Sequence, residues 1–102
     1  MICVRVISVR TLREFWEKMG HEDAEQPLKA WYAEAKKAKW KAPQAIKERY
    51  RSASFVAQNR VVFNIGGNKY RLVVLVKYEM ETVFIRFIGT HKGYDKINVE
   101  TI

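Results

Sequence analysis

Residues 60–95, which decide the fold of this chain, read RVVFNIGGNKYRLVVLVKYEMETVFIRFIGTHKGYD. Within this stretch, three apolar segments of strand length are separated by short polar turns, at about 60–65, 69–78 and 82–89. The turn Gly66-Gly67-Asn68 predicts a hairpin, because Gly and Asn accept the positive φ that tight turns need. Short turns of this kind favour antiparallel pairing of consecutive strands.

The second and third of these strands are predicted to lie in the middle of the sheet. Both are apolar on their two faces, at 72–76 and 83–85. A strand that is buried on both faces reads as a continuous apolar run, whereas an edge strand alternates. The polar segment Glu79-Met80-Glu81 is expected to form the turn between them.

The N-terminal third predicts one strand and one helix. Residues 2–9 alternate as a short β-like segment, with Ile2, Val4 and Val6 on one face and Cys3 on the other. The sequence Thr11-Leu12-Arg13-Glu14 matches a capping box, which predicts a helix that starts at Thr11 and ends at Gly20. Its apolar stripe is Leu12, Phe15, Trp16 and Met19.

Two further helical segments are predicted before the hairpin. Pro27 suits the first turn of a second helix. The apolar stripe of that helix is Leu28, Trp31, Tyr32, Ala35 and Ala38. Pro43 interrupts this pattern. A short helix at about 44–50 is then expected to bury Ile46 and Tyr50, and residues 51–59 are expected to form a loop.

The whole chain, 1–102, is therefore expected to be one small α+β domain. Its order is β-α-α-β-β-β, with an N-terminal strand and two to three helices packed on a mainly antiparallel sheet.

Charge indicates the class of partner. The chain has 19 Lys and Arg against 11 Asp and Glu, a net charge of +8. Such an excess on a small domain favours a polyanion, because neutralised phosphates release counterions. A solvated cationic surface that only maintains solubility is the alternative.

Several classes of protein are disfavoured by composition. Cys3 is the only cysteine, so the sequence predicts neither a disulfide framework nor a thiolate zinc site. The apolar runs are too short to span a membrane, and the alternating N-terminus lacks the apolar region of a signal peptide. We therefore expect a soluble cytoplasmic protein.

His91, Tyr94 and Asp95 follow the last strand and form a candidate catalytic group. An exposed imidazole moves protons near neutral pH, which suits His91 to acid–base catalysis. Tyr94 is suited to stack on an RNA base, and Asp95 to hold the imidazole in one tautomer. The alternative is an ordinary surface loop that caps the sheet.

Arg71 interrupts an otherwise apolar strand. A guanidinium in such a position needs a partner or an open face, and on a rigid strand it is suited to bind a phosphate and stabilise transition-state charge. The alternative is an ion pair with Asp95 or a glutamate. Arg86 raises the same question on the next strand, where strict alternation places it on the opposite side from Phe87 and His91.

Other cations are candidates for sequence-independent RNA contacts. The predicted RNA-binding residues are Arg86, Lys69, Lys92, Lys36 and Lys37. For the lysines of the second helix, a solvated helix face is the alternative reading.

The motifs that are missing limit the chemistry. The sequence has no Gly-rich phosphate loop before a helix and no clustered carboxylates suited to Mg²⁺, and we expect neither a metal nor another cofactor. If the chain is a nuclease, we expect it to be metal-independent and to use the 2′-OH of the RNA as nucleophile, so its expected substrate is RNA and not DNA.

The same residues resemble a known family. The block 60–72, followed by Phe84-Ile85-Arg86-Phe87-Ile88-Gly89-Thr90-His91 and by Tyr94-Asp95, is similar to HigB-type toxins of bacterial type II toxin–antitoxin systems. These belong to the RelE-like superfamily. The resemblance is most specific over residues 55–98 and looser upstream, around Trp31-Tyr32 and Phe55.

The resemblance implies a ribosome-dependent mRNA endonuclease that inhibits translation and growth. It implies an antitoxin with a helix-turn-helix domain, similar to HigA, through which the complex contacts operator DNA. By position, Arg71 resembles the phosphate-binding group and Tyr94 the base-positioning aromatic. His91 falls where the family places Arg or His, and Asp95 is part of the motif. The rival hypothesis is a non-catalytic basic module that binds RNA or the ribosome.

Overall fold

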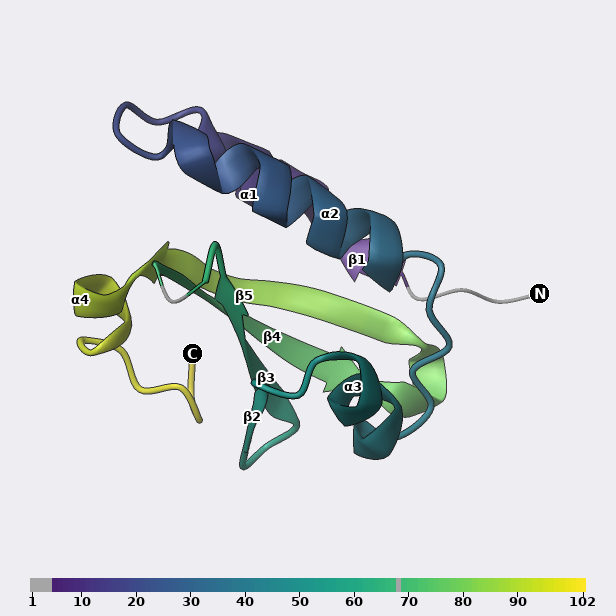
Figure 1. The fold of residues 1–102 in the computed structure, drawn as a ribbon. Helices are drawn as coiled ribbons and strands as arrows, with labels where there is room; N and C mark the ends of the chain where they lie inside the picture. The colour runs from purple at the N-terminus through teal and green to yellow at the C-terminus, as the bar shows by residue number, and fades with distance from the viewer. Residues whose placement is uncertain (1–4, 68) are drawn as a thin grey trace.

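The described residues form a five-stranded sheet with the three longer helices packed on one face (Figure 1). The computed structural model describes residues 5–67 and 69–102. The elements in chain order are β1 (Arg5–Ile7), α1 (Val9–Trp16), η1 (Glu22–Ala24), α2 (Glu25–Ala35), α3 (Pro43–Arg49), β2 (Ser54–Val56), β3 (Arg60–Ile65), β4 (Tyr70–Lys77), η2 (Tyr78–Met80), β5 (Thr82–Thr90) and α4 (His91–Tyr94). This order confirms the predicted α+β class and the order of its main elements.

The sheet has the strand order β1-β5-β4-β3-β2. Strands β4 and β5 are central, as their two-sided apolar sequences predicted. All neighbours are antiparallel except β1 and β5, which are parallel. The short edge strand β2 lies in a segment that was expected to be a loop, so that expectation was wrong. The predicted strand residues Ile2, Cys3 and Val4, and the turn residue Asn68, lie outside the described residues.

Helix α1 differs from its prediction at both ends. It begins at Val9 after Ser8, so Thr11 lies inside the first turn, where its backbone N–H donates to the Ser8 carbonyl at 3.1 Å. The predicted capping box is therefore wrong. The helix ends at Trp16, and Met19 beyond it is 94 % exposed because it no longer follows the helical period. The remaining stripe residues, Leu12, Phe15 and Trp16, are buried as predicted.

Helices α2 and α3 confirm the two predicted helical segments, although Ala38 of the predicted stripe lies beyond the end of α2 and Tyr50, just after α3, is only partly buried. Pro27 lies in the first turn of α2, which buries Leu28, Trp31 and Ala35, and α3 buries Ile46. Aromatic rings join these helices to the sheet. The Trp31 ring lies 5.4 Å from the Phe63 ring of β3, and the Tyr50 ring lies 5.0 Å from it. Edge-to-face pairs of this kind contribute beyond their buried area.

The two faces of the sheet have different coverings. On β4, Tyr70, Leu72, Val74 and Val76 belong to the core under α1 and α2. The opposite face of β4 carries the alternate residues Arg71, Val73, Leu75 and Lys77. We call this side of the sheet the rear face, and it also includes the residues of β3 and β5 that pair with these four. The chain after α4 returns towards β3, since the guanidinium of Arg60 donates to the Ile102 carbonyl at 2.6 Å.

Within residues 5–67 and 69–102, the structure contains no helix of the length and apolar character needed to cross a membrane.

Candidate active site

Arg71 and Tyr94 are brought together at one end of the rear face. Arg71 is the second residue of β4 and pairs with Gly89 of β5. Its guanidinium carbon lies 5.7 Å from the centre of the Tyr94 ring, a cation–π contact that holds a planar cation over an aromatic face. Both side chains are partly exposed, and Arg71 has no ion pair among the described residues. A phosphate therefore has access to the guanidinium.

His91 and Asp95 lie at the two ends of the short helix α4. The backbone N–H of Asp95 donates to the His91 carbonyl at 3.0 Å. Both side chains are exposed, and no hydrogen bond joins them in the described part of the chain. Lys92 is exposed on the same helix. The structure thus places the imidazole and the carboxylate on one turn, next to Tyr94, without a direct side-chain contact between them.

The position of α4 depends on the Phe87 ring. A Cβ atom built on Gly89 would lie 2.5 Å from Phe87 Cζ, and one built on Gly93 would lie 3.4 Å from the same atom. The ring therefore lies against both glycines and joins β5 to α4. Thr90 caps the helix by accepting from the Gly93 backbone N–H at 3.3 Å. These positioning residues were not predicted, although two glycines that flank the site residues were a signal for close approach.

A β-bulge changes the direction of Arg86. Val73 pairs with Phe87 but Val74 pairs with Ile85, so Arg86 is the extra residue on β5. Its guanidinium lies 5.8 Å from the ring of Phe84, whose partner Leu75 lies on the rear face. The expected strict alternation was therefore wrong, and Arg86 shares the rear face with Phe87 and Arg71.

Asn64 is a further residue near the site that was not predicted. It is the direct partner of Arg71 in the pairing of β3 with β4, so the two side chains extend from the same face of the sheet. Asn64 is partly exposed. A carboxamide in an apolar strand was the available signal, because β-sheets are depleted in Asn.

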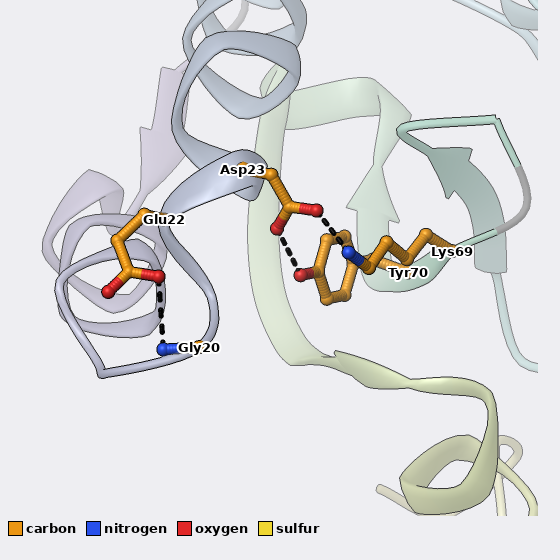
Figure 2. Close-up of polar contacts among 5 residues, drawn as sticks. All are labelled: Gly20, Glu22, Asp23, Lys69 and Tyr70. Atoms are coloured by element: carbon orange, nitrogen blue, oxygen red, sulfur yellow. Dashed lines mark hydrogen bonds and ion pairs between the residues drawn. The ribbon is translucent and has the colours of Figure 1, made fainter.

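Lys69 is paired with an acidic residue from the helical layer. The Asp23 carboxylate of η1 accepts from the Lys69 ammonium group and, at 2.5 Å, from the Tyr70 hydroxyl (Figure 2). The Lys69 hydrogen bond is the main cause that lowers the pKa of Asp23, and burial is the main cause that raises the pKa of Tyr70. This contact fixes η1 to the start of β4, immediately before Arg71.

Replacing Asp23 with asparagine should remove part of the pH dependence of stability. Because folding lowers the pKa of Asp23, its contribution to the free energy of unfolding is complete above about pH 4 and is lost as the pH falls further. Thermal unfolding measured from pH 7 to pH 3 should show a shallower loss of Tm in Asp23→Asn than in wild type. The matched control is Glu17→Gln, an exposed carboxylate that should leave the profile unchanged. A wild-type profile in Asp23→Asn would contradict this role.

Lys36 and Lys37 follow the C-terminal end of α2. The Lys36 ammonium group lies 5.2 Å from the Tyr32 ring, and Lys37 is exposed. In Figure 1 this end of α2 lies on the side of the molecule away from α4. The structure therefore separates these lysines from the Arg71–Tyr94 pair, although both remain accessible to a large polyanion.

The candidate site gathers four kinds of side chain near one end of the sheet. These are the guanidinium of Arg71 on β4 and the phenol, imidazole and carboxylate of Tyr94, His91 and Asp95 on the turn after β5. Nowhere in residues 5–67 and 69–102 do three or more His, Cys, Asp or Glu side chains gather in a way that could hold a metal ion. Proton transfer and stabilisation of negative charge are the reactions that this set of residues can support.

A comparison with the sequence models of known families identifies the class of protein to which this chain belongs. The sequence model of the HigB toxin, described as the RelE-like toxic component of a toxin–antitoxin system, matches residues 24–97, which include every predicted site residue. The chain therefore belongs to the HigB toxin family, as its resemblance implied.

Curated relatives agree with this assignment. The chain is 31 % identical over 94 residues to the mRNA interferase toxin HigB of Escherichia coli K12, covering 90 % of this chain and 88 % of the relative. It has the same identity and coverage with the mRNA interferases HigB of Escherichia coli O157:H7 and Shigella flexneri.

Proposed function

We propose that this chain is a ribosome-dependent mRNA endonuclease, the toxin of a type II toxin–antitoxin module, which inhibits translation and growth. The observation that carries the proposal is the contact of Arg71 with Tyr94, which lies on the same short helix as His91. The similarity to mRNA interferases supports the same activity. We further propose that residues 1–102 act as a single toxin domain in the cytoplasm.

In the proposed mechanism, the RNA supplies its own nucleophile. The 2′-oxygen attacks the adjacent phosphorus as its proton is removed, the bond from phosphorus to the 5′-oxygen breaks, and that oxygen is protonated. His91 transfers a proton in this reaction, since its exposed imidazole is suited to acid–base catalysis. The products are a 2′,3′-cyclic phosphate and a 5′-hydroxyl, and the reaction requires neither a metal nor another cofactor.

The other site residues bind and position the RNA. Arg71 stabilises the negative charge that develops on the phosphoryl oxygens, because a guanidinium donates to two oxygens at once. Tyr94 stacks on a base, and Asp95 assists His91. The cations proposed for phosphate contacts are Arg86, Lys69, Lys92, Lys36 and Lys37. Lys69 gives up its Asp23 partner to make such a contact.

A toxin of this family has an antitoxin partner. We propose that the antitoxin of this chain carries a helix-turn-helix domain, similar to HigA, and that the complex reaches operator DNA only through it. The ribosome and mRNA are the other proposed partners.

Growth on induced expression separates the toxin from a non-catalytic basic module. Wild type should arrest growth, and His91→Ala should relieve the arrest because proton transfer is lost. The soluble amount of each protein is measured in the same cultures, since an unfolded variant would also be harmless. Equal arrest by both proteins at equal soluble amounts would favour an RNA- or ribosome-binding module over an enzyme.

A further inference from the structure

The outer edge of β3 is unpaired near the site. Strand β2 covers β3 only from Arg60 to Val62, since its first residue, Ser54, pairs with Val62. From Phe63 to Ile65, β3 has β4 on one side, and no strand of the described chain lies on the other. An unpaired strand edge presents N–H and C=O groups that another chain can pair with.

The register shows which backbone groups face outward. The backbone N–H of Val76 donates to the Asn59 carbonyl at 3.0 Å. Because Arg60 pairs with Leu75, Asn59 lies opposite Val76, so these two residues form a hydrogen-bonded pair. Hydrogen-bonded residues alternate along an antiparallel pair, so Phe63 and Ile65 face β4. The N–H and C=O of Asn64 therefore point to the unpaired edge.

A cavity of about 190 Å³ adjoins this edge. Its walls come mainly from α2, the end of α3 and β3, and include Pro27, Ala30, Trp31, Tyr50, Phe63 and Asn64. Trp31 is only 2 % exposed, and its indole N–H has no hydrogen-bond partner in the described structure. An apolar side chain from a neighbouring peptide suits these walls.

The surface next to the cavity is basic. A second hollow shares Glu34 and Tyr50 with the cavity and is lined also by Lys37, Lys39 and Arg49. The Glu34 carboxylate already accepts from Arg49 and from the Tyr50 hydroxyl. Among the described residues, Lys37 and Lys39 form no ion pair. An occupant of the cavity is therefore best flanked by acidic residues.

We propose that an extended segment of the antitoxin adds to β3 at Asn64, places an apolar side chain beside Trp31 and sets acidic side chains against Lys37 and Lys39. This inference rests on the proposed function, because it takes the toxin's antitoxin as the partner. A peptide is favoured over RNA because the outward N–H and C=O of one residue match the backbone of another strand. The added strand lies about 10 Å from β4, two strand spacings, and so restricts access of RNA to Arg71.

Filling the cavity tests the position of the segment. Ala30 is exposed on α2 and lines the cavity, whereas Ala33 is exposed on the same helix and does not. With the full-length cognate antitoxin as probe, Ala30→Arg should weaken binding about tenfold or more, which is the effect expected from the loss of one well-packed interface contact. Ala33→Arg, which adds the same charge, should bind as wild type does. Equal affinities of the two variants would overturn the proposal.

Ribosome binding by the same two variants shows whether RNA, and not the antitoxin, occupies the cavity. If Ala30→Arg weakens ribosome binding and leaves antitoxin binding unchanged, the cavity belongs to an RNA-binding surface and the proposal fails. Absence of mRNA cleavage by wild type would instead contradict the proposed enzyme. The two failures are therefore distinguishable.

A second pair of variants tests the backbone contact. Asn64→Pro removes the outward N–H, which β4 does not use, and Asn64→Ala removes only the side chain. The proline variant should bind the antitoxin about tenfold more weakly than the alanine variant, which is the effect expected from the loss of one backbone hydrogen bond and the contacts beside it. In wild type, amide hydrogen exchange at Asn64 should slow in the complex. Unchanged exchange at this amide would overturn the strand addition, whether or not the proline variant folds.

Discussion

Replacing Arg71 with alanine should reduce the rate of mRNA cleavage by about 10²–10³-fold, the typical effect of removing one group that stabilises transition-state charge. The guanidinium lies 5.7 Å from the centre of the Tyr94 ring and has no ion pair in the described residues, which leaves it available for the phosphate contact that we propose. The measurement is single-turnover cleavage on programmed ribosomes, with thermal unfolding as the check on the fold.

The matched control for Arg71 is Lys77→Ala. Lys77 is a cation on the same strand and the same face, at the other end of β4, where it pairs with Thr82. Its loss should change cleavage less than about threefold, as expected for a cation remote from the reacting phosphate. Arg71→Lys should retain part of the activity, because lysine keeps the charge and loses the planar two-point contact. Full activity of Arg71→Ala would remove Arg71 from the mechanism.

Replacing Gly89 with alanine should destabilise the protein by about 1–3 kcal/mol, the usual effect of overpacking, and should also remove most of the cleavage activity. The new Cβ would lie 2.5 Å from Phe87 Cζ, so the ring must move, and the ring supports Gly93 in α4. Because α4 carries His91 and Tyr94, its displacement separates the site residues. Thermal unfolding and single-turnover cleavage measure the two effects.

Two variants control for the Gly89 substitution. In Gly93→Ala the added Cβ lies 3.4 Å from the same ring atom, so a shift of a few tenths of an ångström should suffice and the effect should be small. In the double variant Phe87→Leu/Gly89→Ala, the smaller side chain should restore part of the stability lost in Gly89→Ala alone, since contacting residues are coupled. Equal stability and activity of Gly89→Ala and Gly93→Ala would contradict the role of the Phe87 ring.

The central sheet was predictable because its sequence signal is strong. Strands β4 and β5 carry long runs of apolar residues, and the turn before β4 contains Gly66 and Gly67, which both have positive φ. The edge strand β2 was not predictable in the same way. Its three residues, Ser54–Val56, are exposed or partly exposed, and pairing with β3 defines the strand. Short edge strands depend on their partners more than on their own composition.

The candidate site was only partly predictable. The sequence order places His91, Tyr94 and Asp95 on one turn, and the hairpin brings Arg71 to the same end of the sheet. The bulge at Arg86 was not visible, because the apolar pattern of β5 fits a regular strand equally well. The pairing of Lys69 with Asp23 depends on how η1 packs on the sheet, which no local pattern encodes.

Cleavage of mRNA on programmed ribosomes by the wild-type protein, with a metal chelator present, tests the central claim most directly. The account predicts fragments that end in 2′,3′-cyclic phosphates, much less cleavage of the same RNA without ribosomes, and loss of cleavage in His91→Ala. Tight ribosome binding by the wild-type protein without any cleavage would contradict the claim and identify the chain as a binding module.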